Sequence, residues 1–299
     1  MGADVLSIIP ERKGQTVKEL LSSLSQVNGI KAIALGGSYA RGTAKSESDI
    51  DLGLYYSDKD LLDISSIKDI VAEISLANKP STVTGLYEWG PWVNGGAWIE
   101  TSSGKIDLLY RCLEHVERVI QDSNKGNFFS DFLQQPPYGF YSVTYLAESK
   151  TCIPLFDPFH LIQTLKEKVL VYPEKLKTAI IQENLWSIEF TLLYAKKCIT
   201  GNDVYTTAGC VTRILSCLTQ VLFALNEEYF ISDREAMNAI EHFKLRPEDY
   251  KQEVEAILRS LDPQRNLLLK CIQGIEQLFL KVKKLAGSLY ASKYQLGII

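Results

Sequence analysis

Hydrophobic and polar residues alternate differently in the two halves of the chain. In the first half, apolar residues at helical spacing over residues 16–27 and 59–77 predict two amphipathic helices. Short apolar runs at residues 31–35 and 49–56 predict two strands. Residues 97–101 and 105–110 predict a β-hairpin, because the Ser-Ser-Gly sequence between them has the composition of a tight turn.

The second half has only the helical pattern. Long periodic stretches near residues 173–200, 203–230, 234–243, 247–261 and 264–286 predict five helices. Prolines and glycines at residues 126–139 separate the halves, and 299 residues exceed the usual size of one domain. We therefore expect an α+β fold: a mixed sheet flanked by helices in residues 1–125, followed by an all-α bundle in residues 126–299.

Composition narrows the class of protein and its partners. With 46% hydrophobic and 23% charged residues, the chain is typical of a globular protein. Acidic residues outnumber basic ones by 36 to 32, so no overall positive field attracts nucleic acid. The first ten residues lack a basic leader, and we expect no membrane-spanning stretch and a cytoplasmic protein. The six cysteines form no C-x-x-C pair, which favours reduced thiols over a zinc site.

Residues 35–52 contain the candidate chemistry. Gly36 and Gly37 follow a predicted strand, so the backbone can approach a phosphate without a Cβ in the way. A helix beginning at Ser38 would direct free N–H groups at that phosphate. Asp49 and Asp51 lie two residues apart on a predicted strand, which places both carboxylates on one face. Such close carboxylates repel each other, and Mg²⁺, which prefers hard oxygen ligands, would offset this repulsion.

Glycine-serine after a strand, then ten residues, then aspartate-hydrophobic-aspartate resembles the signature of the DNA polymerase beta-like nucleotidyltransferases. This superfamily includes the aminoglycoside and lincosamide nucleotidyltransferases. The resemblance implies that Gly37 and Ser38, with Gly36 beside them, bind the triphosphate. It also implies that Asp49 and Asp51 bind metal ions and that a later strand supplies a third carboxylate, for which Asp107 is the candidate.

The activity that the resemblance implies is transfer of a nucleoside monophosphate from a nucleoside triphosphate, with ATP as the expected nucleotide and two Mg²⁺ ions as the expected cofactors. Pyrophosphate would be released, and the absence of a positive field favours the hydroxyl of a small acceptor. Residues 106–119 and 222–230 resemble bacterial proteins that join this domain to a helical one, which could close over the acceptor and supply a homodimer contact. Two alternatives stay open: nucleotidylation of a protein partner, and nucleotide binding without turnover.

Two charged side chains have competing interpretations. Arg41 could contact the triphosphate, because its forked guanidinium suits phosphate oxygens, or it could pair with Asp49 or another nearby acid. Glu148 occupies the place where the related antibiotic-modifying enzymes have an acidic general base. A solvated helix glutamate is the favoured interpretation of Glu148.

Histidine and tryptophan side chains favour structural roles. His160 is expected at a helix start capped by Asp157 rather than in catalysis. Trp89, Trp92 and Trp98 lie among glycines and could line a nucleobase or acceptor pocket, but aromatic residues around a sheet are more often core. We therefore expect the three tryptophans in the core.

Overall fold

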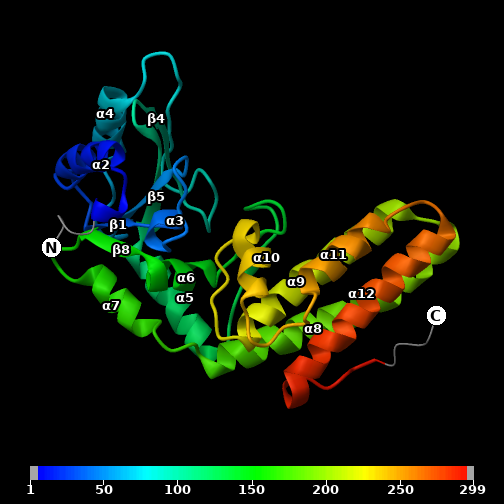
Figure 1. Cartoon of the computed structure of the whole chain (residues 1–299). Coiled ribbons are helices and arrows are strands. Elements are labelled where there is room, and N and C mark those ends of the chain that lie inside the picture. The colour runs from blue at the N-terminus through cyan, green and yellow to red at the C-terminus, as the bar shows by residue number, and fades with distance from the viewer. Residues whose placement is uncertain (1–5, 295–299) are drawn as a thin grey trace. The chain divides into compact units, whose positions relative to one another are not determined.

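The computed structural model describes residues 6–294 and divides into two compact units. The first comprises Met1–Gln121 and Ser130–Val171, and the second Asp122–Phe129 and Tyr172–Ile299. Strands and helices mix in the first unit, whereas the second is helical (Figure 1). The predicted α+β fold is confirmed. The first five residues of the N-terminal segment, which we expected to carry no leader, lie outside the described residues.

A six-stranded sheet forms the centre of the first unit. Its strand order is β3-β4-β5-β2-β1-β8, and β2 and β5 run parallel while the other neighbours are antiparallel. The predicted hairpin is present as β4 and β5. The strands are β1 (Ala32–Leu35), β2 (Ile50–Tyr56), β3 (Thr82–Val83), β4 (Gly96–Thr101), β5 (Gly104–Cys112) and β8 (Ile153–Phe156), with a separate small pair, β6 (Ser130–Asp131) and β7 (Phe140–Tyr141).

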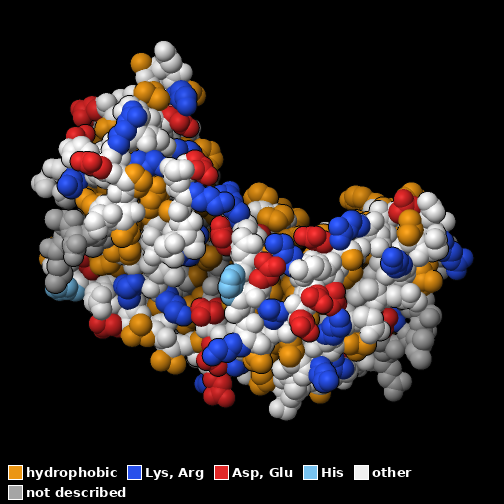
Figure 2. All heavy atoms as spheres, viewed as in Figure 1, with side chains coloured by type: hydrophobic (Ala, Val, Ile, Leu, Met, Phe, Trp, Pro, Cys, Tyr) orange, Lys and Arg blue, Asp and Glu red, His pale blue; other side chains and the backbone are white. Residues whose placement is uncertain are grey.

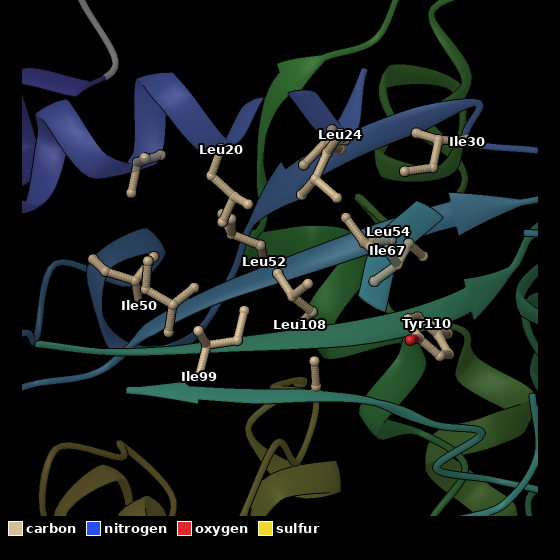
Figure 3. Packing of buried hydrophobic residues seen from close by; sticks show 14 of the residues in the cluster. Leu20, Leu24, Ile30, Ile50, Leu52, Leu54, Ile67, Ile99, Leu108 and Tyr110 are labelled. Atoms are coloured by element: carbon tan, nitrogen blue, oxygen red, sulfur yellow. The ribbon is translucent and has the colours of Figure 1, made fainter. Parts of the chain in front are cut away.

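One face of this sheet is apolar and buries the core of the unit. Leu52 and Leu54 of β2 and Leu108 of β5 point into it, as do Leu20 and Leu24 of the first long helix (Figure 3). Because side chains alternate along a strand, the intervening residues of β2 and β5 project from the opposite face. The helices of this unit are α2 (Glu11–Leu24), α3 (Gly37–Ala40), α4 (Ile64–Ile74), α5 (Leu113–Lys125, which ends in the second unit), α6 (Thr144–Thr151) and α7 (Leu161–Lys168), with a 3₁₀ turn η1 (Leu6–Ile8).

The boundary between the units differs from the one expected after residue 125. Residues 130–171 return to the first unit because β8 pairs with β1, with Leu35 opposite Ile153. The sequence signal for β8 is weak, since the strand has four residues and contains Pro154. The helix start expected after Asp157 is present: its carboxylate accepts from the N–H groups of Leu161, Ile162 and Gln163, the first residues of α7.

The second unit is a helical bundle, and the five predicted helices are present. Leu218 and Val221, in the stretch predicted as a helix near residues 203–230, are fully buried. Helix α9 is long and apolar enough to cross a membrane, which the sequence expectation overlooked, but 78% of its most apolar window is buried inside the protein, as in a core helix. The helices are α8 (Glu174–Cys198), α9 (Val204–Leu225), α10 (Asp233–Glu241), α11 (Tyr250–Arg259) and α12 (Arg265–Ala286), with 3₁₀ turns η2 (Ile199–Gly201) and η3 (Gly287–Leu289).

The unit boundary predicts different behaviour for two N-terminal fragments. A fragment of residues 1–171 should show a cooperative thermal transition. A fragment of residues 1–125 should not, because β1 loses its β8 partner and becomes an open sheet edge. Near-ultraviolet circular dichroism and thermal denaturation measure the difference, and equal cooperativity of the two fragments would contradict the observed boundary.

Candidate functional site

Two carboxylates lie opposite each other on the face of the sheet away from the core. The parallel register of β2 and β5 pairs Asp51 with Asp107. Burial, and then the negative charges of Asp107 and Asp49, raise the pKa of Asp51 to about 6. The fold therefore holds like charges together in a place where water screens them poorly, as active sites often do.

Lys105, which sequence analysis did not single out, neutralises part of this charge. Its ammonium lies 3.0 Å from Asp107 Oδ2 and 3.4 Å from Asp49 Oδ2. Burial raises the pKa of Asp107, although the Lys105 charge opposes the shift. Asp49 itself precedes β2, and 44% of its side chain is exposed. The three predicted carboxylates are thus brought together, but Asp49 reaches the cluster from a loop rather than from the strand.

The glycine pair lies directly beside Asp51. The Gly36 N–H donates to the Asp51 carbonyl at 2.8 Å. Gly37 has φ +59°, and a Cβ there would lie 1.7 Å from Asp51 Oδ2. Only glycine therefore allows the turn and the carboxylate to occupy this place. Ser38 follows in α3, a single helical turn, so the expected contribution of a helix N-terminus is confined to that turn.

Arg41 completes this part of the site. Among the residues described, its guanidinium forms no salt bridge, and its positive charge lowers the pKa of Asp51 against the effect of burial. Of the two interpretations left open, the pairing with Asp49 is not observed, because Asp49 contacts Lys105 instead. Arg41 is left free for a negatively charged ligand, for which its fork of donors suits phosphate oxygens.

The donors fit a divalent cation in chemistry. Asp107 Oδ1 is buried without a hydrogen-bond partner, and the charged form of Asp51 is destabilised by burial and then by its acidic neighbours. Within residues 6–294, no three Asp, Glu, His or Cys side chains form a ready-made metal group. Mg²⁺ is commonly held by one or two carboxylates, with water and substrate phosphate completing its octahedron. Asp51 and Asp107 meet that requirement, and Lys105 competes with a cation for one oxygen each of Asp107 and Asp49.

Glu148 has a partner that the sequence did not reveal. Both of its carboxylate oxygens accept from Arg111 of β5, from Nε and Nη2 at 2.7 Å each. Arg111 is buried and also lies over the ring of Tyr145. Arg111 lies four residues after Asp107 on β5, so side-chain alternation places both on the same face of the sheet. The bidentate pair therefore joins α6 to the sheet face that carries Asp107. The geometry favours a structural role for Glu148 over that of a free general base.

The three tryptophans differ in their surroundings. Trp92 packs edge-on against His115 and stacks on Phe140, but Trp92 and Trp89 are only half-buried, so neither is a core residue in full. Trp98 is 49% exposed, which contradicts the core expectation. It projects from the same face as the aspartates because it is paired with Asp107 across β4 and β5.

Paired, partly buried carboxylates next to a glycine turn and an unpaired arginine are typical of sites that bind phosphate groups. The comparisons with known proteins define that class further. Residues 17–82 match the family described as nucleotidyltransferase domain, and residues 142–233 match a domain of unknown function, DUF4037. The chain therefore contains a nucleotidyltransferase domain, which makes it a transferase.

Among solved structures, the chain is similar to a nucleotidyltransferase-like protein from Exiguobacterium sibiricum. The two share 11% sequence identity with a TM-score of 0.46, over 92% of this chain and 77% of that one. No curated protein matches the chain.

Gly37 can be tested against Gly42, a matched control in the same loop. Both have positive φ, but a Cβ on Gly42 meets nothing within 4 Å. The Gly37→Ala and Gly42→Ala variants should share a backbone strain of about 1–3 kcal/mol. Gly37→Ala alone displaces Asp51 and should lower nucleotide turnover about a hundredfold. Pyrophosphate release and thermal denaturation measure the two effects, and equal turnover in both variants would contradict the proposed contact.

Glu148→Gln separates a structural from a catalytic role. Loss of the carboxylate charge leaves Arg111 buried and poorly paired, and should lower the free energy of unfolding by about 2 kcal/mol, less than the cost in a fully buried pair. Turnover of the remaining folded protein should keep the same pH profile. A loss of the acidic limb of that profile, at unchanged stability, would instead identify Glu148 as a base.

Proposed function

We propose that the protein transfers a nucleoside monophosphate from a nucleoside triphosphate, with ATP as the first candidate, to a hydroxyl of a small molecule in the presence of Mg²⁺. The observation that carries this proposal is the contact of Gly37 with Asp51, opposite Asp107. This contact puts the glycine turn, which can bind phosphate, within one strand spacing of the carboxylates, which can bind cations. The nucleotidyltransferase-domain match supports the reaction class.

Each group of residues has one task in this proposal. The backbone of Gly36, Gly37 and Ser38, with the Arg41 guanidinium, binds the β- and γ-phosphates. Asp51 and the unpaired Oδ1 of Asp107 would hold Mg²⁺, with Asp49 as a further ligand once Lys105 releases its carboxylate. When bound, the cation would neutralise the charge that develops on the leaving pyrophosphate.

The reaction is a displacement at the α-phosphorus. The acceptor oxygen forms a new bond to that phosphorus as the bond to the β-phosphate oxygen breaks, and pyrophosphate leaves. The acceptor hydroxyl loses its proton to solvent or to a carboxylate of the cluster that the cation leaves uncoordinated. The residues of the chain thus position the phosphates and hold the charges.

The charge distribution supports a small acceptor. The formal net charge is −4, and both signs of charge are interspersed over the face of each unit seen in Figure 2. A protein that binds a nucleic acid through its phosphates needs a basic stripe or patch. The face shown offers none.

The proposal is tested by product formation. The protein is incubated with each α-labelled nucleoside triphosphate, Mg²⁺ and a panel of aminoglycosides and lincosamides, and the products are separated by chromatography. We expect a labelled small-molecule adduct together with pyrophosphate. A labelled protein band in added lysate would indicate a protein acceptor, and triphosphate binding without pyrophosphate release would indicate a nucleotide-binding protein without turnover.

Asp51→Asn should abolish turnover and yet stabilise the metal-free protein. Because its pKa in the folded state is raised to about 6, ionised Asp51 destabilises the fold at pH 7.5. A neutral amide should recover about 2 kcal/mol of that cost. Asp69→Asn, an exposed aspartate of α4, is the control and should change neither quantity. Thermal denaturation without metal and pyrophosphate release are measured, and full turnover in Asp51→Asn would overturn the site assignment.

A further inference from the structure

An aromatic pair lies beside the carboxylates, on the side away from the glycine turn. Trp98 of β4 is paired with Asp107, and its ring stacks on that of Trp89 with centroids 4.9 Å apart and an interplanar angle of 26°. Trp98 nevertheless stays 49% exposed. A large aromatic surface left open beside a polar site is typical of a binding surface rather than of a core.

The pair is held in place by its loop. The Trp89 N–H donates to the Asn94 carbonyl at 2.8 Å, and the Asn94 side chain donates to the buried Tyr56 hydroxyl at 2.9 Å. Gly96 leaves room for the Trp89 ring, since a Cβ there would lie 2.9 Å from Trp89 Cζ3. The aromatic surface is therefore arranged before any ligand binds, which lowers the ordering cost of binding.

The order of the strands indicates which substrate this surface meets. Across the aspartate face, the glycine turn follows β1, Asp51 lies on β2, Asp107 on β5 and Trp98 on β4. In an in-line displacement the attacking oxygen and the leaving group lie on opposite sides of the phosphorus. If the pyrophosphate leaves at the glycine turn, the acceptor hydroxyl approaches from the side of β5 and β4.

We propose that Trp98, supported by Trp89, is the platform on which the ring of the acceptor lies, so that the acceptor is a hydroxylated ring compound such as a sugar or cyclitol. The apolar C–H face of such a ring packs on the indole, and its hydroxyl reaches the carboxylates one strand away, about 5 Å. This inference rests on the proposed nucleotidyl transfer. It adds the class of acceptor and a residue that determines specificity.

The experiment compares Trp98→Ala and Trp98→Phe with Trp186→Ala. Trp186, on α8, is the matched control because it is 43% exposed and also stacks on a ring, that of Phe190. For each variant, calorimetry gives the Kd of α,β-methylene-ATP with Mg²⁺, and the transfer assay gives the KM of the ring compounds in the panel. Sorbitol, an open-chain polyol, and a serine-containing peptide serve as acceptors without a saturated ring.

We expect Trp98→Ala to raise the KM of a ring acceptor about tenfold or more, which corresponds to the loss of one stacking contact. Trp98→Phe should restore part of the affinity, and the nucleotide Kd should stay within about twofold of wild type. Sorbitol and the peptide should be poor acceptors in every variant.

Other results overturn the inference in distinguishable ways. A nucleotide Kd that weakens as much as the acceptor KM would show that the pair binds the base. Equal behaviour of Trp98→Ala and Trp186→Ala would remove any role in binding. Wild-type protein that binds nucleotide but modifies no ring compound would exclude the acceptor class, whereas wild-type protein that binds no nucleotide would overturn the proposed function itself.

Discussion

The parallel pairing of β2 with β5 is the constraint on which the site depends. It places Asp51 opposite Asp107 although more than fifty residues separate them in the chain. The pairing is fixed from the other face, where Leu52, Leu54 and Leu108 are fully buried. A slip of one residue would send these leucines to the polar face. The hydrophobic core therefore holds together two carboxylates that would otherwise repel each other.

Much of this arrangement could be predicted from the sequence because the signals are local. Alternation along residues 49–56 gives the strand and the side on which Asp51 lies, and two glycines after a strand give the turn. The class of the reaction came from the resemblance of this glycine and aspartate pattern to the polymerase beta-like signature, and the nucleotidyltransferase-domain match confirms the class. The site residues themselves stay predictions, and their geometry makes Asp51 and Asp107 stronger candidates than Asp49.

What the sequence could not provide depends on contacts between distant segments. The Arg111–Glu148 pair joins residues 37 positions apart, and no local pattern marks either as a partner of the other. Strand β8 is recognisable only by its pairing with β1, so the boundary was expected too early. Trp98 is a large aromatic residue of the kind usually found in a core. Only its strand register, opposite Asp107, shows that it lies on the face away from the core.

Strand β5 contributes both signs of charge to the same face. Lys105, Asp107 and Arg111 share that face by alternation. Arg111 is committed to Glu148, with two short hydrogen bonds that fix its guanidinium, and so cannot serve a phosphate. Lys105 instead bridges two carboxylates at 3.0 and 3.4 Å, a contact that a partly exposed, flexible ammonium can exchange for another. Among the charged side chains described on β5 and at the glycine turn, Lys105 and Arg41 therefore remain available to a triphosphate. Because Arg41 follows β1 and Lys105 lies on β5, positive charge flanks Asp51 on both sides. The sheet face is therefore asymmetric. Groups that can donate hydrogen bonds to phosphate lie at the β1 end, and the exposed indole of Trp98 lies at the β4 end.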